Sequence, residues 1–144
     1  MSDESTFWKL INKHLPAKCH VQRIETGSTG RGIPDVNLCH QGVECWVELK
    51  IVKGKQVKLS PEQIAWHFRR ARAGGTSWVI ARDKADGVRK GKYDRIYVWP
   101  SSCVQGIFEK GIKCEGAFIF EAPFDWVLFQ TVLFGGGCEK NGLF

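Results

Sequence analysis

Three residues in the first half of the chain have the types and spacing that suit metal-dependent hydrolysis of phosphodiesters. Asp35 follows Pro34, and Glu48 and Lys50 stand two positions apart in a later segment. This reaction needs a positioned water and neutralisation of negative charge, and Mg²⁺ held by two or three carboxylates provides both. A nearby lysine can orient the water and stabilise the developing charge. The residues therefore predict a carboxylate and lysine site for a hard cation.

The local sequence predicts how these side chains come together. Residues 35–39 and 43–52 alternate between apolar and polar character and are separated by a short turn, which indicates a β-hairpin. Side chains alternate along a strand, so Glu48 and Lys50 must lie on the same face. Adjacent strands are close enough for Asp35 and Glu48 to reach one ion.

A helix is predicted to begin just after this hairpin. Ser60 is suited to the N-cap, Pro61 to the first helical position, and Gln63 to the third position of a capping box. Gln63 could equally face the metal. The predicted buried stripe of this helix consists of Ile64, Phe68 and Ala71.

The remaining elements follow from apolar periodicity and from glycine and proline positions. Helices are predicted at 5–15, 104–110 and 124–134, the last ending at Gly135, and strands at 19–24, 77–82, 95–99 and 117–120. The last helix is apolar on nearly every side, so we expect it to be buried on several faces, and a partner subunit is one way to achieve this.

The order of motifs is specific. Gly-x-Pro-Asp, a hairpin turn, Glu-x-Lys, a basic loop and Leu-Ser-x-Glu-Gln at a helix start resemble the PD-(D/E)XK nucleases, and within them the archaeal-type and phage Holliday-junction resolvases and the VRR-NUC domains. The resemblance spans about residues 4–82. It implies a restriction-endonuclease-like α/β fold, with a central mixed sheet flanked by helices. We expect one nuclease domain over 1–134, with a C-terminal elaboration at 93–134 and a flexible tail at 135–144.

The resemblance also implies roles for the central residues. Asp35, Glu48 and the backbone carbonyl of Leu49 would be ligands of Mg²⁺ or Mn²⁺, and Lys50 would be the catalytic lysine.

Further roles are implied outside the hairpin. An acidic residue on the first helix completes the metal shell in this superfamily; Glu4 matches that position and Glu25 is its rival. Gln63 corresponds to a helix glutamine that faces the active site. Ser28 or Thr29 corresponds to a hydroxyl in the loop that contacts phosphate.

The charge balance favours an anionic partner. The chain has 21 Lys and Arg against 15 Asp and Glu, a formal charge of +6. Basic residues that could pair with phosphates would make DNA binding strongly dependent on salt. The candidates for this role are Arg31, Lys53, Lys55, Lys58, Arg69 and Arg70.

The leading hypothesis is a structure-specific endonuclease for branched DNA, similar to Holliday-junction resolvases. Symmetric cutting of a four-way junction requires two sites related by a two-fold axis, which predicts a homodimer. The alternatives are a flap or general DNA nuclease of the VRR-NUC type, a non-catalytic nucleic-acid-binding module of the same fold, and an interaction module in the last third of the chain.

The N-terminus lacks the features of a signal peptide, and no apolar run is long enough to span a bilayer. We therefore expect a cytoplasmic protein that does not enter the membrane.

Overall fold

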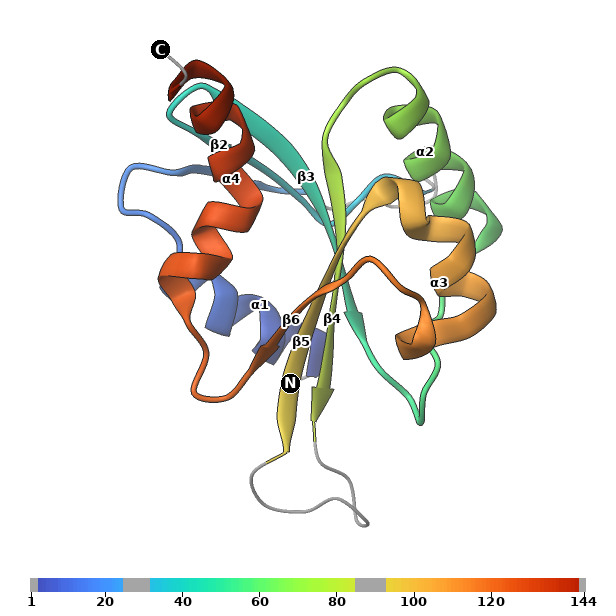
Figure 1. Cartoon of the computed structure of the whole chain (residues 1–144). Coiled ribbons are helices and arrows are strands. Elements are labelled where there is room, and N and C mark those ends of the chain that lie inside the picture. Colours follow the sequence, from blue (N-terminus) through green and yellow to red (C-terminus); the bar gives the residue numbers. More distant parts are fainter. Residues whose placement is uncertain (1–2, 25–31, 85–92, 143–144) are drawn as a thin grey trace.

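The computed structural model describes residues 3–24, 32–84 and 93–142, with side chains described as far as Gly135 (Figure 1). The elements in chain order are α1 (Asp3–Lys13), β1 (His20–Arg23), β2 (Val36–His40), β3 (Val43–Ile51), α2 (Pro61–Arg72), β4 (Ser77–Lys84), β5 (Asp94–Pro100), α3 (Val104–Lys110), β6 (Phe118–Glu121) and α4 (Trp126–Gly142), with short 3-10 turns at Ser101–Cys103 and Gly111–Lys113.

The strands form one sheet in the order β1-β2-β3-β4-β5-β6. Every neighbouring pair is antiparallel except β3 and β4, which run parallel with Glu48 opposite Val79. A parallel pair cannot be joined by a tight turn and needs a crossover, which α2 provides. The predicted fold class, a mixed sheet flanked by helices, is confirmed.

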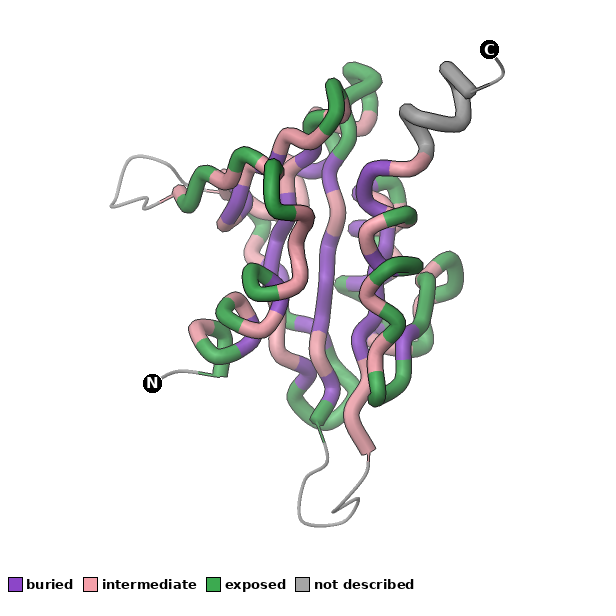
Figure 2. The backbone as a smooth tube through the Cα atoms, turned by 90° about the vertical axis from the view of Figure 1, so that its left-hand side faces the viewer, coloured by how far each residue is buried: buried purple, intermediate pink, exposed green. Residues whose placement is uncertain are grey.

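Helices cover both faces of this sheet, with α1 and α4 on one side and α2 and α3 on the other (Figure 1). Alternation along β3 sends Val47 and Leu49 into the core beneath α1 and α4, and leaves Glu48 on the α2 face. The strand β4 is buried on both faces. Ile80 lies in the apolar core on the side of α1 and α4, and Val79 lies in the core on the side of α2 and α3. Figure 2 shows the buried segments concentrated along the strands between the helical layers.

The start of α2 follows from local hydrogen bonding. Ser60 has extended backbone angles, with φ −76° and ψ 159°, and its Oγ accepts from the Gln63 amide at 3.1 Å. In return, the Ser60 amide donates to Gln63 Oε1 at 2.9 Å, which completes the capping box. The predicted helix start is confirmed.

The predicted buried stripe of α2 is wrong in part. Phe68 is 58% exposed, whereas His67 is fully buried. The helix turns the face that carries Gln63 and His67 towards β3, because these side chains interact with Glu48. Hydrophobic periodicity does not detect an inner face whose contacts are polar.

The last helix also differs from expectation. It continues to Gly142, so the predicted end at Gly135 is wrong; a glycine costs about 1 kcal/mol within a helix but does not forbid it. Its side chains are not buried on several faces by the described chain, since Val127 is 75% exposed and Leu128 51%. The flexibility of 135–144 stays a prediction. Within the described ranges, no helix is both long enough and apolar enough to cross a bilayer.

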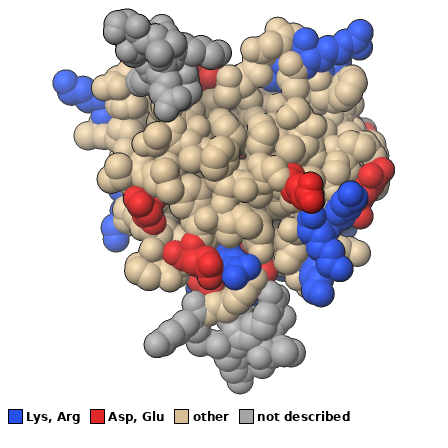
Figure 3. Space-filling view, in the orientation of Figure 1, with Lys and Arg blue, Asp and Glu red and all other residues tan. Residues whose placement is uncertain are grey.

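Charged side chains are unevenly spread over the face that carries α3 and α4. In Figure 3 lysines and arginines lie towards its margins, and a broad uncharged area occupies its middle. This face is therefore not a continuous basic surface.

Candidate active site

The hairpin brings Asp35 beside Glu48. Val36 pairs with Val47 in the antiparallel register, so the next pair outward is Asp35 and Glu48. The Leu49 amide donates to Asp35 Oδ2 at 2.7 Å, which fixes the carboxylate at the end of the hairpin. The sequence prediction that these two acidic residues meet agrees with this register.

A glycine allows the segment before Asp35 to approach α2. Gly32 has φ +81°, a conformation that favours glycine, and a Cβ at this position would collide with the backbone carbonyl of Glu62. The close approach therefore holds the entry to β2 against the first turn of α2.

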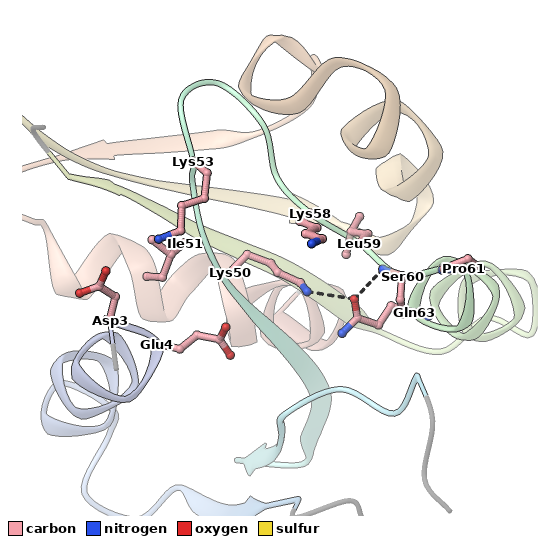
Figure 4. A pocket seen from close by; sticks show the side chains of 10 residues that line it. All are labelled: Asp3, Glu4, Lys50, Ile51, Lys53, Lys58, Leu59, Ser60, Pro61 and Gln63. Atoms are coloured by element: carbon pink, nitrogen blue, oxygen red, sulfur yellow. Dashed lines mark hydrogen bonds between the residues drawn. The ribbon is translucent and has the colours of Figure 1, made fainter. Parts of the chain in front are cut away.

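Glu48 is the centre of a hydrogen-bonded network. It is 2% exposed, and its Oε2 accepts from Gln63 Nε2 at 3.2 Å. Gln63 Oε1 accepts from Lys50 Nζ and from the Ser60 amide, both at 2.9 Å (Figure 4). Lysine and a backbone amide can only donate, so the glutamine must turn its NH₂ group to Glu48. Gln63 therefore serves both as cap and as site residue.

Histidine lies on the other side of the Glu48 carboxylate. His67 Nε2 is 3.6 Å from Glu48 Oε1, and His67 Nδ1 is 3.0 Å from Ser77 Oγ. His67 is not among the site residues that the sequence predicts. The available signal was its spacing, because residues i and i+4 share one helix face and Gln63 is four residues earlier.

The pKa values reflect crowding of carboxylates. Burial, followed by the Asp35 charge, raises the pKa of Glu48 to about 9. Burial and Asp35 likewise raise the pKa of Glu4, against the opposing effect of Lys50. Burial and then Lys50 lower the pKa of His67 to about 4. Glu4, Asp35 and Glu48 therefore share one electrostatic environment with Lys50.

An open hollow of about 820 Å³ reaches Glu4 and Lys50, whereas Asp35 and Glu48 are not among its lining residues. In Figure 4, Glu4 extends from α1 towards Lys50, and Gln63 approaches Lys50 from α2. The hollow is lined by Asp3, Glu4, Lys50, Ile51, Lys53, Lys58, Leu59, Ser60, Pro61 and Gln63.

The other predicted contact residues do not all gather here. Lys55 lines a separate hollow beside α3. Arg69 and Arg70 line a third, where the Arg70 guanidinium lies 4.6 Å from the ring centroid of Trp66. The predicted positions Glu25, Ser28, Thr29 and Arg31 lie outside the described residues.

No family model and no curated protein sequence matches this chain. The chain is similar to the solved structure of Hjc, a Holliday junction resolvase from the archaeal hyperthermophile Archaeoglobus fulgidus, with 15% identity, a TM-score of 0.47, and coverage of 83% of this chain and 86% of that chain.

The mixed sheet flanked by helices agrees with the fold class that the sequence predicts, and Asp35 and Glu48 lie at the same end of one hairpin, as the sequence also predicts. The fold is α/β, a mixed sheet with helices on both faces. Its chemistry has to be inferred from its own side chains.

The donor set suits a hard cation. Among the described residues, no three His, Cys, Asp or Glu side chains form a preassembled metal cage. Mg²⁺, however, usually keeps several waters and needs only one or two protein carboxylates. Asp35 and Glu48 would provide these, and within the described chain Glu48 Oε1 is buried without a hydrogen-bond donor. A cation here would offset the Asp35 repulsion that, after burial, raises the pKa of Glu48.

Proposed function

We propose that this chain is a metal-dependent DNA endonuclease that hydrolyses phosphodiester bonds in branched DNA, in the manner of a Holliday-junction resolvase. The observation that carries the proposal is the buried Glu48 carboxylate beside Asp35, linked through Gln63 to the Lys50 ammonium. Gln63 and Lys50 line an open hollow. A buried, crowded carboxylate is costly to ionise, and a structural role alone does not account for placing two acidic residues together.

Asp35 and Glu48 would hold Mg²⁺ or Mn²⁺, with the Leu49 carbonyl as a further ligand. The Leu49 amide faces Asp35, and the N–H and C=O of one residue lie on the same edge of a strand, so this carbonyl also lies on the Asp35 side. When bound, the ion would polarise the phosphate and lower the pKa of a bound water. Glu4, at the N-terminal end of α1, would complete the acidic shell through water.

Lys50 would stabilise the negative charge that develops on the phosphate. Its ammonium has three donors and Gln63 Oε1 accepts one, which leaves donors for substrate and water. Gln63 keeps the ammonium near the scissile bond, so that its position is fixed before the substrate binds.

Lys53 and Lys58 border the hollow and are exposed, which suits contact with the phosphates on either side of the scissile bond. Arg69 and Arg70 would extend this contact along α2. Cutting a four-way junction in both strands requires two copies of this site, so the active species would be a homodimer.

The proposal is tested by incubating purified protein with end-labelled four-way, flap, nicked and linear DNA in Mg²⁺, with EDTA as a blank. Wild type should cut branched DNA, and Glu48→Ala should reduce cleavage about 100- to 1000-fold, in the range found when transition-state stabilisation is removed. Glu44→Ala is the matched control, because Glu44 is an exposed acid on the same strand.

Equal cutting of linear and branched DNA would reject the resolvase substrate and leave a general nuclease. Absence of cleavage, with DNA binding unchanged in Glu48→Ala, would favour a non-catalytic binding module.

A further inference from the structure

The Glu48 carboxylate is approached by α2 at both of its oxygens. Gln63 Nε2 donates to Oε2 at 3.2 Å, and His67 Nε2 faces Oε1 at 3.6 Å. Gln63 and His67 are one helical turn apart, so a single rigid element carries both groups. The helix is therefore placed to fix the orientation of the carboxylate.

Among the described residues, no hydrogen bond is made at the Oε1 side of the Glu48 carboxylate. Neither Glu48 Oε1 nor His67 Nε2 has a hydrogen-bond partner within the described chain, although both residues are almost fully buried. Buried polar atoms without partners are rare and costly. A movement of about 0.5 Å would bring this pair into hydrogen-bonding range.

The His67 imidazole is hydrogen-bonded to Ser77 on the side away from Glu48. Its Nδ1 lies 3.0 Å from Ser77 Oγ, and Ser77, at the start of β4, is 2% exposed. A hydroxyl can donate or accept, so with Ser77 as donor the ring can carry its proton on Nε2 and present it to Glu48. The Trp66 ring meets His67 edge-on at 5.3 Å between centroids and restricts its movement.

We propose that His67, supported by Ser77, is a positioning residue that holds Glu48 Oε1 and so directs the carboxylate towards the metal. The inference rests on the proposed function, in which Glu48 is a ligand. The terminal torsion of a glutamate is broad, so one hydrogen bond from Gln63 leaves it free to turn. A second donor at the other oxygen removes this freedom.

A purely structural role makes a different prediction. If His67 only fills space between α2 and the sheet, its replacements should affect folding according to their volume and should not change metal affinity in a folded protein. Two amide replacements separate these cases. In His67→Gln the amide reaches the place of Nε2 and can still donate to Glu48, whereas in His67→Asn it reaches only the place of Nδ1, beside Ser77.

The experiment is titration with Mn²⁺, followed by the electron paramagnetic resonance signal of the free ion, together with thermal unfolding in EDTA. We expect His67→Asn to bind Mn²⁺ about 10- to 100-fold more weakly than wild type, the range found when a partner of a metal ligand is removed. We expect His67→Gln to remain within about fivefold of wild type. Ser77→Ala, which leaves the ring in place, should weaken binding by about threefold.

Equal Mn²⁺ affinities of His67→Gln and His67→Asn would overturn the positioning role. If both His67 variants fail to fold, an unchanged Mn²⁺ affinity of Ser77→Ala would overturn it. The variant Glu48→Ala distinguishes failure of the proposed metal site from failure of the role of His67. Mn²⁺ binding by wild type that is unaffected by Glu48→Ala would overturn the proposed metal site and the role of His67 with it. Binding that is lost in Glu48→Ala but kept in His67→Asn would overturn the role of His67 alone.

Discussion

Neutralising Glu48 should make the metal-free protein more stable at alkaline pH, although the same change removes the proposed metal ligand. Burial and the Asp35 charge raise the pKa of Glu48 to about 9, from an ordinary value of 4.5. A carboxyl whose pKa is higher in the folded state binds more protons there than in the unfolded chain. The free energy of unfolding therefore falls as pH rises between these two values.

At lower pH, His67 affects the free energy of unfolding in the opposite direction to Glu48. Its pKa falls to about 4 from 6.5, so the unfolded chain binds the extra proton between these values and stability rises with pH across that window. Above pH 6.5 the free energy of unfolding no longer changes through His67, but it continues to fall through Glu48 up to about pH 9. At about 1.4 kcal/mol per pH unit, wild type should lose up to about 3 kcal/mol through Glu48 over that range.

The assay is urea unfolding in EDTA at pH 6.5, 7.5 and 9. Glu48→Gln cannot titrate at this position, so its advantage over wild type should grow with pH, while the effects of groups that do not interact with Glu48 cancel in the difference. Glu44→Gln should keep the wild-type slope, and Mg²⁺ should restore stability to wild type alone, because it binds the ionised carboxylate. Parallel pH profiles for wild type and Glu48→Gln would refute the reasoning.

Three further outcomes follow from named contacts. Lys50→Met should lower the single-turnover cleavage rate at least about 100-fold while DNA affinity in Ca²⁺ changes little; an equal loss in both measurements would contradict a role in the transition state. Ser60→Ala should cost about 1 kcal/mol in urea unfolding, since it removes the cap of α2, and an unchanged midpoint would be inconsistent with that cap. Gly32→Ala should cost more than about 2 kcal/mol, because its Cβ meets the Glu62 carbonyl, and a melting temperature equal to wild type would show that the approach is not tight.

The central part of the site could be predicted because it depends on strand periodicity. Once residues 43–52 are assigned as a strand, Glu48 and Lys50 must share a face, and the short turn brings Asp35 opposite Glu48. No long-range information is needed. The capping box is equally local, which explains why the start of α2 was predicted correctly.

The features that the sequence does not predict depend mainly on how the helices pack against the sheet. His67 reads as an ordinary polar residue until α2 is placed against β3 and β4, where it meets Glu48 and Ser77. Phe68 was assigned to the core because apolar periodicity assumes an apolar inner face. The length of α4 was missed because glycine marks many helix ends without requiring one.

The crossover between the parallel strands has a consequence for how the protein can vary. The helix α2 connects β3 to β4. Its docking also brings Gln63 and His67 to Glu48 and Ser60 to Gln63. A transient detachment of α2 would disable the centre as a whole. None of these three side chains comes from the region from 93 onward, so substitutions there can leave the contacts between α2 and Glu48 unchanged.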